Sequence, residues 1–505
     1  MPSSAMVQAL AEPASMAGRA LGAGLWTVGT RLATKLIDLV MLVSLARFLG
    51  PAEFGLVAMA MAAVFIVEAL FELPMAAALI RAPALTPDML HTAFTLSLLR
   101  GLVIALLLLA LAWPLAAFND EPRLRALLAV LALAPALRGL VSPRMVEYAR
   151  VFNFRPDARM ELSGKTVALV LSIGIAATTG SYWAIAAATV GGPLTTTLMS
   201  YVIAPLRPRL TLSRWPYFSD LIGWNFLSQA GAALNWQIDR LILPRLTTTA
   251  TFGQYAMGKQ ISEIPIQALI QPLFRPAMSA MVAADADRRS RYVQLSNAIG
   301  LVMVGVMGVP MLWPDILVRV ALGPSWEPAA QWLRWISLVS VLGLPAILMG
   351  PLVMTLDRTR WVAARTLIEL MIRLPLVWWG AMRFGIPGAI AGSAIATAAG
   401  TFTGMCIVRR LVDVGLVSQA MALVRPMLVL LAAGAVLHLG APWVQEAATL
   451  PGLLARAVPL GGAYLFAYLF FAWLVWRLAG RPAGLERHTL DRLAKRLRPR
   501  RPGAP

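Results

Sequence analysis

Long apolar stretches recur along this chain, and they constrain its fold more than any other feature. We read fourteen of them, at about 22–46, 55–80, 91–117, 125–142, 166–180, 183–204, 219–244, 253–282, 293–313, 330–355, 361–383, 387–408, 422–440 and 457–479. Each is close to the roughly 20 residues that an α-helix needs to cross about 30 Å of hydrocarbon. Backbone polar groups in lipid must bond within their own segment, so the stretches predict an all-α polytopic membrane protein.

The composition agrees with that class. Hydrophobic residues make up 59% and charged residues 13% of the chain, against roughly 45–50% and 25% in a soluble domain. Cys406 is the single cysteine, which excludes an internal disulfide and a thiolate metal site. The three histidines lie far apart in the sequence, so we expect no metal centre and no cofactor.

The net charge of +20 follows an alternation between the loops. Even-numbered connections are basic, as in RPDAR, RPRLTLSR, DRRSR, DRTR and VRR, whereas odd-numbered ones are short and carry tryptophan. Basic loops face the cytoplasm in membrane proteins, so we place both termini there: a segment at 1–21, which does not resemble a cleavable signal, and a basic tail at 481–505. The charge is then explained by topology, and we expect no nucleic-acid partner.

The chain matches itself when it is shifted by 198 residues. The matches fall on residue types that apolar composition alone does not produce. They are Trp26 with Trp224, Arg47 with Arg245, Phe54 with Phe252, Gly55 with Gly253, Met59 with Met257 and Pro74 with Pro272.

This shift divides the chain into two halves of six spans each. An even number of spans gives both halves the same orientation, so we predict a parallel repeat with a transport pathway at its interface. The N-lobe would comprise residues 22–205 and the C-lobe residues 206–412. Two extra spans, at 413–480, lie outside the repeat.

The first span carries three charges on one helix face. Arg31, Lys35 and Asp38 follow an i, i+4, i+7 spacing. A charge at the centre of a transmembrane helix costs roughly 2.5–3.5 kcal/mol on insertion scales. We therefore expect this face to look into a bundle or a water-filled cavity rather than into lipid.

Other spans carry polar side chains with similar spacing, and together they predict a polar cavity. The candidates that line it are Asn235, Asp239, Arg240, Lys259, Glu263, Gln267, Gln271, Arg365 and Glu369, and Glu68 lies in the second span. An alternative reading is internal ion pairing, within Lys259/Glu263 and Arg365/Glu369, or of Arg31 or Lys35 with Glu68 or Glu72. Pro74 and Pro272 occupy matching repeat positions and are candidate hinges.

Three segments resemble the WzxC-like branch of the Wzx polysaccharide exporters. They are ARFLGPAEFGLVAMA (46–60), YARVFNFRPDARMEL (148–162) and DRLILPRLTTTATFGQYAMGKQISEIPIQALIQPLFRPAMSAM (239–281). The resemblance covers about residues 20–410. One departure is TTTATFG, where the family pattern has a glycine-containing loop.

The resemblance implies a flippase of the multidrug/oligosaccharidyl-lipid/polysaccharide exporter superfamily and no enzymatic activity. Its two lobes would move undecaprenyl-diphosphate-linked oligosaccharide from the cytoplasmic to the periplasmic leaflet of the bacterial inner membrane, by alternating access, for surface polysaccharide synthesis. A polysaccharide polymerase and other assembly proteins are the implied partners, besides membrane lipids. The hypothesis for the site is that Arg31 and Lys35 attract the diphosphate and Asp38 orients them, while Asn235, Gln267 and Gln271 hydrogen-bond the sugars. Candidates for ion coupling are Asp38, Glu68, Asp239 and Glu263.

Three alternatives remain open on the sequence alone. A cation-coupled multidrug antiporter shares the architecture but would favour an anionic or apolar cavity. A membrane-embedded glycosyltransferase would need a larger extramembrane loop than any here. A non-transporting assembly scaffold would leave the charged helix faces without a purpose.

Overall fold

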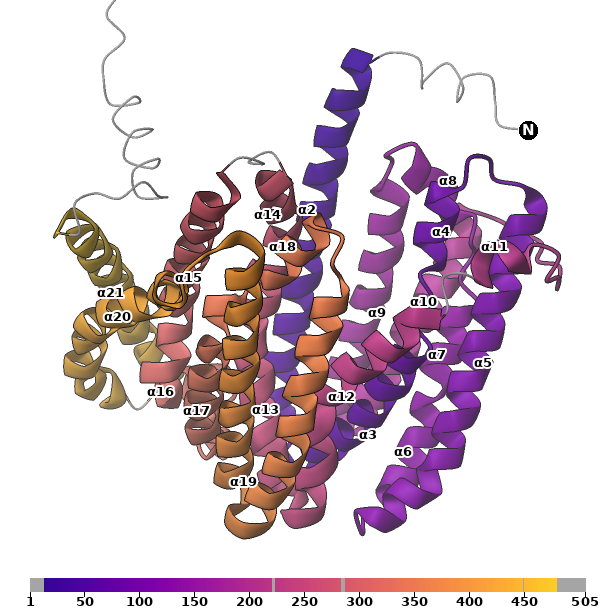
Figure 1. Ribbon diagram of the computed structural model, residues 1–505. Coiled ribbons are helices and arrows are strands. Elements are labelled where there is room, and N and C mark those ends of the chain that lie inside the picture. Colours follow the sequence, from indigo (N-terminus) through magenta and orange to yellow (C-terminus); the bar gives the residue numbers. More distant parts are fainter. Residues whose placement is uncertain (1–12, 220–222, 283–286, 448, 479–505) are drawn as a thin grey trace, which may run out of the picture. The chain divides into compact units, whose positions relative to one another are not determined.

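The protein is α-helical in the computed structural model, which describes residues 13–219, 223–282, 287–447 and 449–478 (Figure 1). No strand occurs in those ranges. Eight helical segments within them are long and apolar enough to cross a membrane. The predicted all-α multi-pass class is confirmed, while the count of fourteen spans stays a prediction.

The chain divides into two compact units, Met1–Gly253 and Gln254–Pro505. The helices that begin in the first unit are α2 (Pro13–Phe48), α3 (Pro51–Leu70), α4 (Met75–Arg81), α5 (Pro87–Phe118), α6 (Arg123–Leu131), α7 (Leu133–Gly139), α8 (Met145–Arg150), α9 (Arg155–Thr179), α10 (Trp183–Ile203), α11 (Trp215–Ser219), α12 (Gly223–Leu246) and α13 (Thr249–Pro265). Helix α12 packs against α3 and is therefore grouped with the first unit. The lobe boundary at 205/206 remains an interpretation of the repeat.

Two predicted spans of the first unit are each built from two helices. The stretch 55–80 is broken at Phe71–Pro74, after which α4 begins. The stretch 125–142 is broken at Ala132, where Pro135 has no N–H to bond the carbonyl of Leu131.

The segment between the fourth and fifth spans differs from the prediction. The predicted spans at 125–142 and 166–180 leave residues 143–165 as a connection between them. Only the short helix α8 occupies its first half, and α9 already begins at Arg155. Pro156 lies in the first turn of α9, where a missing N–H is tolerated, so the helix extends through RPDARMEL into the apolar run.

The second unit contains the remaining helices. They are η1 (a π-helix, Ile266–Ile270), α14 (Gln271–Val282), α15 (Arg288–Leu312), α16 (Pro314–Ala321), η3 (Pro324–Trp326), α17 (Ala329–Leu342), η4 (Leu344–Ala346), α18 (Met349–Thr355), α19 (Arg360–Val412), α20 (Leu416–Gln445) and α21 (Leu450–Leu478). Helix α19 holds two predicted spans, which meet at Gly385, where φ is 64°. That left-handed backbone conformation favours glycine.

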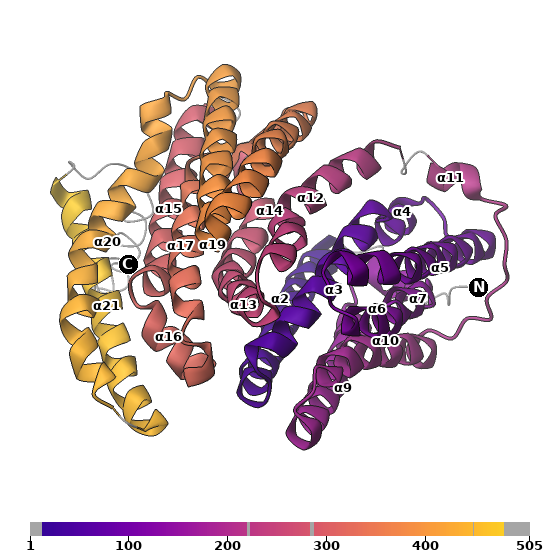
Figure 2. The ribbon, with the colours of Figure 1, turned by 90° about the horizontal axis from the view of Figure 1, so that it is seen from below.

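The two spans outside the repeat are attached firmly to the second unit. Helices α20 and α21 run together beside α15 (Figure 2). The hydroxyls of Tyr464 and Tyr468 donate to the carbonyls of Gly305 and Leu301, at 2.7 and 2.8 Å. These bonds satisfy polar groups that would otherwise lie unpaired in an apolar environment.

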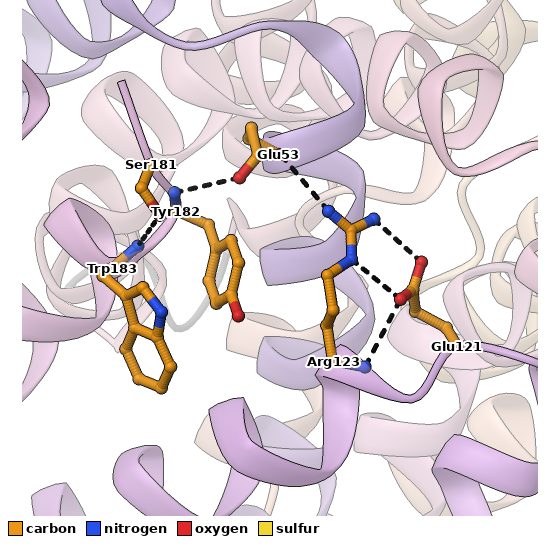
Figure 3. A network of polar contacts seen from close by, with 6 residues as sticks. All are labelled: Glu53, Glu121, Arg123, Ser181, Tyr182 and Trp183. Carbon is orange, nitrogen blue, oxygen red and sulfur yellow. Dashed lines mark hydrogen bonds and ion pairs between the residues drawn. The ribbon is translucent and has the colours of Figure 1, made fainter. Parts of the chain in front are cut away.

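Odd-numbered connections of the first unit meet at one end, which we call the odd end. The Glu53 carboxylate accepts a hydrogen bond from the Tyr182 backbone N–H at 3.0 Å and lies 3.4 Å from the Arg123 guanidinium (Figure 3). The same guanidinium donates two hydrogen bonds of 2.9 Å to the Glu121 carboxylate. Arg245 forms an ion pair with Asp120. The first, third, fifth and seventh connections are thereby joined.

Even-numbered connections meet in the same way. Arg150 donates to the carbonyls of Leu79 and Ala82, and the Tyr148 hydroxyl donates to the carbonyl of Ile203. The second, fourth and sixth connections therefore share an end. Odd-numbered connections at one end and even-numbered connections at the other are what a chain that crosses the membrane with each span requires. Which of the two ends faces the cytoplasm remains a prediction from the basic loops.

Candidate functional site

The charged face of α2 lies beside α9. Asp38 pairs with Lys165 of α9, with 2.5 Å between the carboxylate oxygen and Nζ, while Arg31 and Lys35 are exposed. Thr34 is buried, and its hydroxyl donates a hydrogen bond to the backbone carbonyl of Arg31. We call Arg31, Lys35, Asp38 and Lys165 the α2–α9 cluster.

The α2–α9 cluster is cationic overall, because it holds three basic side chains and one carboxylate. Sequence reasoning missed Lys165, which lies 127 positions from Asp38, and helix spacing cannot connect two spans. Exposed guanidinium and ammonium groups in such a place can bind phosphate or carboxylate oxygens strongly. Asp38 holds Lys165 in position, and its predicted role in orienting Arg31 and Lys35 stays a prediction.

A second charged group lies between α3, α5 and α7. Glu68 forms an ion pair with Arg138 of α7. Both side chains line a cavity of about 110 Å³, together with Ser97, Arg100 and the backbone of Gly139. The alternative in which Arg31 or Lys35 pairs with Glu68 or Glu72 stays a prediction.

The candidates on α12 are mostly buried. Asn235 is 8% and Asp239 4% exposed, and each makes a polar contact. Arg240 is half-buried, and its Nε has no hydrogen-bond partner among the described residues. Burial of an amide, a carboxylate and a guanidinium on one helix is expensive unless they are satisfied, which is consistent with a functional or tightly paired role.

Lys259, Glu263 and Gln267 are half-buried on α13 and the π-helical turn that follows. An every-fourth-residue spacing drifts by about 40° per step in an α-helix. A π-helix closes i→i+5 bonds and turns less per residue, so the turn at Ile266–Ile270 offsets that drift. The predicted polar side chains therefore stay closer to one helix face than they would in a continuous α-helix. The side chain of Gln271 lies outside the described residues.

Arg365 and Glu369 belong to an internal network. Glu369, 7% exposed, lies 3.7 Å from Arg365 and 2.6 Å from Arg373, which also donates to the Thr397 hydroxyl at 2.8 Å. Arg365 donates to the carbonyl of Gly400 at 3.1 Å. The predicted pairing of Arg365 with Glu369 is confirmed, and the contacts indicate that these groups fasten the two halves of α19.

Both candidate hinge prolines lie beside a helix irregularity. Pro74 precedes the first residue of α4, after the break at Phe71. Pro272 follows the π-helical turn directly. Their role as hinges stays a prediction. Within the ranges that the structure describes, no group of three or more His, Cys, Asp or Glu is placed to hold a metal ion.

Comparison with known sequences gives three related matches. The family described as "Polysaccharide biosynthesis protein" matches residues 44–331. The succinoglycan biosynthesis transport protein ExoT of Rhizobium meliloti is 25% identical over 411 residues, covering 77% of this chain and 78% of ExoT. The amylovoran biosynthesis protein AmsL of Erwinia amylovora is 22% identical over 310 residues, covering 57% and 77%.

Solved structures share the fold at low sequence identity. The lipid II flippase MurJ in an inward closed conformation gives a TM-score of 0.69 at 12% identity, covering 90% of this chain and all of MurJ. An inward-facing multidrug transporter of the MATE family and MOP superfamily gives 0.57 at 11% identity, covering 75% and 94%.

Proposed function

The chain belongs to the polysaccharide biosynthesis protein family, and from that premise we propose that it flips a lipid-linked oligosaccharide across the bacterial inner membrane. In coarse terms it is a multi-pass membrane transporter with the fold of the MOP superfamily that acts in polysaccharide biosynthesis. The finer proposal names the cargo as undecaprenyl-diphosphate-linked and the direction as cytoplasmic to periplasmic.

The observation that carries the proposal is the cationic face of α2. Arg31 and Lys35 are exposed on this helix face, and a membrane span tolerates such charges where they face a protein interior or water. The Asp38 carboxylate of the same face pairs with Lys165. A diphosphate offers several oxygen acceptors and negative charge, which suits such a group. A small organic cation would be repelled by it.

The depth of these charges supports the direction. At about 1.5 Å per residue, Arg31 lies about 26 Å and Asp38 about 15 Å from Phe48 at the odd end of α2. If the odd end is periplasmic, the cationic face runs from the membrane centre to the cytoplasmic boundary. A diphosphate in the cytoplasmic leaflet would meet it first.

Other candidates keep their proposed roles. Asn235 and Gln267 supply amides that suit sugar hydroxyls, and Asp38, Glu68, Asp239 or Glu263 could carry a coupling ion. The breaks beside Pro74 and Pro272 would allow helices to bend during alternating access. A polymerase that receives the oligosaccharide is the expected partner, and both termini are expected in the cytoplasm.

The test is the location of lipid-linked oligosaccharide in cells that lack this protein. Extracted diphosphate-linked repeat units would be compared with and without an impermeant glycosidase added from the periplasmic side. We expect the units to accumulate in a protected form while surface polysaccharide is lost. Accessible units, or normal surface polysaccharide in a strain without a redundant exporter, would overturn the proposal and favour a small-solute antiporter. Loss of oligosaccharide synthesis itself would point to an enzyme.

A further inference from the structure

The pentapeptide LRGLV occurs twice, at 99–103 in α5 and at 137–141, where α7 ends. The two copies cross each other backbone to backbone. A Cβ added at Gly139 would lie 2.5 Å from the carbonyl oxygen of Ser97, and one added at Gly101 would lie 2.7 Å from that of Pro135. The contact is reciprocal, because Ser97 lies four residues before Gly101 and Pro135 lies four residues before Gly139.

This crossing forces two cations together. Arg100 and Arg138 precede the two glycines, and both line the cavity of about 110 Å³ described above. Their charges act on each other. Arg100 is half-buried, whereas the Arg138 side chain is 47% exposed. Two guanidinium groups that line one cavity repel each other, so an arrangement that holds them there needs a compensating negative charge.

The protein supplies only part of that charge from the cavity wall. Glu68 is the one carboxylate among the lining residues, and it pairs with Arg138. Glu72 acts on Arg100 from the break between α3 and α4 and is itself exposed. The Nε of Arg100 is buried without a hydrogen-bond partner in the described part of the chain, and a buried donor left unpaired costs about 1–3 kcal/mol.

The depth of the cluster indicates what kind of anion reaches it. Glu68, Arg100 and Arg138 lie about 22–27 Å along their helices from the odd end, at about 1.5 Å per residue. The hydrocarbon core is about 30 Å thick. The guanidinium groups therefore lie near one boundary of the core, close to the level of phosphate groups in that leaflet.

We propose that the cavity between α3, α5 and α7 is a binding site for a phosphate-type oxyanion, held by the Arg100 and Arg138 guanidinium groups. A phosphate or diphosphate group fits the cavity's size and accepts bidentate bonds from arginine. Glu68 competes with the anion for Arg138. The site lies within the first unit, on helices that carry none of the α2–α9 cluster.

The experiment measures binding of inorganic pyrophosphate to the full-length protein in phosphatidylcholine nanodiscs, by ³¹P NMR line broadening and calorimetry. We expect binding by the wild type and, for R100Q and R138Q, affinity at least about tenfold weaker, because each loses charge-assisted hydrogen bonds. E68Q keeps both arginines and removes the competitor, so its affinity should be unchanged or higher. R123Q, which removes an arginine at the odd end, is the matched control and should bind as the wild type does.

Several outcomes would overturn the inference. Absence of pyrophosphate binding by the wild type is one, and equal binding by R100Q, R138Q and the wild type is another. Weaker binding by folded E68Q would show that the carboxylate helps the anion, contrary to the proposal. E68Q keeps the test decisive even if loss of an arginine prevents folding.

Two sources of the same phosphate chemistry are separated by adding phosphatidylglycerol to the nanodiscs. Competition with pyrophosphate that depends on Arg100 and Arg138 would assign the site to a lipid headgroup. Binding that is unaffected by the lipid would assign it to a free or cargo-borne phosphate. R100Q and R138Q leave Arg31 and Lys35 in place. Unchanged pyrophosphate binding by these two variants would therefore overturn this inference alone, whereas the proposed flippase function is tested by the location of the oligosaccharide in cells.

Discussion

Gly55 and Gly253, which are 198 residues apart and equivalent in the internal repeat, cross each other in direct backbone contact. A Cβ added at Gly253 would lie 2.8 Å from the Gly55 nitrogen, and one added at Gly55 would lie 3.0 Å from the Gly253 nitrogen. Each would also collide with a carbonyl oxygen, that of Pro51 or Thr249, which are themselves equivalent positions. The first turns of α3 and α13, which are equivalent in the repeat, therefore contact each other reciprocally.

We predict that G55A and G253A each destabilise the protein by about 1–3 kcal/mol, because backbone atoms cannot move aside as flexible side chains do. The measurement is thermal unfolding of purified protein in detergent, together with surface polysaccharide in cells. A Cβ at Gly50, one turn from this crossing, would meet no atom within 4 Å. G50A should therefore behave as the wild type, and equal effects of G50A and G55A would contradict the account.

Asp38 and Lys165 are predicted to be coupled. D38N should destabilise the protein by about 1–3 kcal/mol because it leaves a charged ammonium without its partner in a membrane span. The double variant D38N/K165Q should lose less stability than the sum of the two single variants. A double-mutant cycle by thermal unfolding measures this coupling, and strictly additive effects would show that the pair is not formed.

Glu369 should be structurally essential. E369Q leaves Arg365 and Arg373 facing each other inside the helix pair, and breaking a buried ion pair costs about 3–5 kcal/mol. We expect a strongly reduced yield of folded protein, read by size-exclusion chromatography. E446Q is the control, because Glu446 is 72% exposed in its pair with Arg456. A well-folded, transport-deficient E369Q would instead return Glu369 to a substrate-binding role.

The odd end should respond to pH through Glu121. Hydrogen bonds from the Arg123 guanidinium lower the pKa of the Glu121 carboxyl below its usual value. Its stabilising effect is therefore present above the unfolded pKa of about 4.3 and is lost as pH falls through the lower folded value. Near about pH 7, the free energy of unfolding of R123Q should be lower than that of the wild type by up to about 1 kcal/mol, and its unfolding temperature should be lower accordingly. That difference should shrink near about pH 3, and a difference independent of pH would refute the assignment.

Spacing in the sequence predicted two kinds of feature. Spacing along one helix predicted the apolar runs and the Arg365–Glu369 pair, and the spacing between repeats predicted the match of Gly55 with Gly253. The break before Pro74 was also predictable, because proline removes a helical hydrogen bond. The extended start of α9 was not, since polar residues at 155–162 resemble a loop until packing stabilises them as helix.

Pairs between different spans could not be derived from spacing. Lys165 with Asp38 and Arg138 with Glu68 depend on which helices become neighbours. One overlooked signal was present, the repeated LRGLV at 99–103 and 137–141. An arginine followed by glycine inside an apolar run, found twice, indicates a close crossing that carries charge.

The central claim is that Arg31 and Lys35 draw an anionic, lipid-linked cargo into the transporter, and one variant tests it most directly. R31Q/K35Q would be expressed in cells lacking the wild-type protein, with its membrane level measured by immunoblot. We predict a normal membrane level of the variant, with diphosphate-linked oligosaccharide retained in the glycosidase-protected leaflet. Accessible oligosaccharide and normal surface polysaccharide in that variant would contradict it.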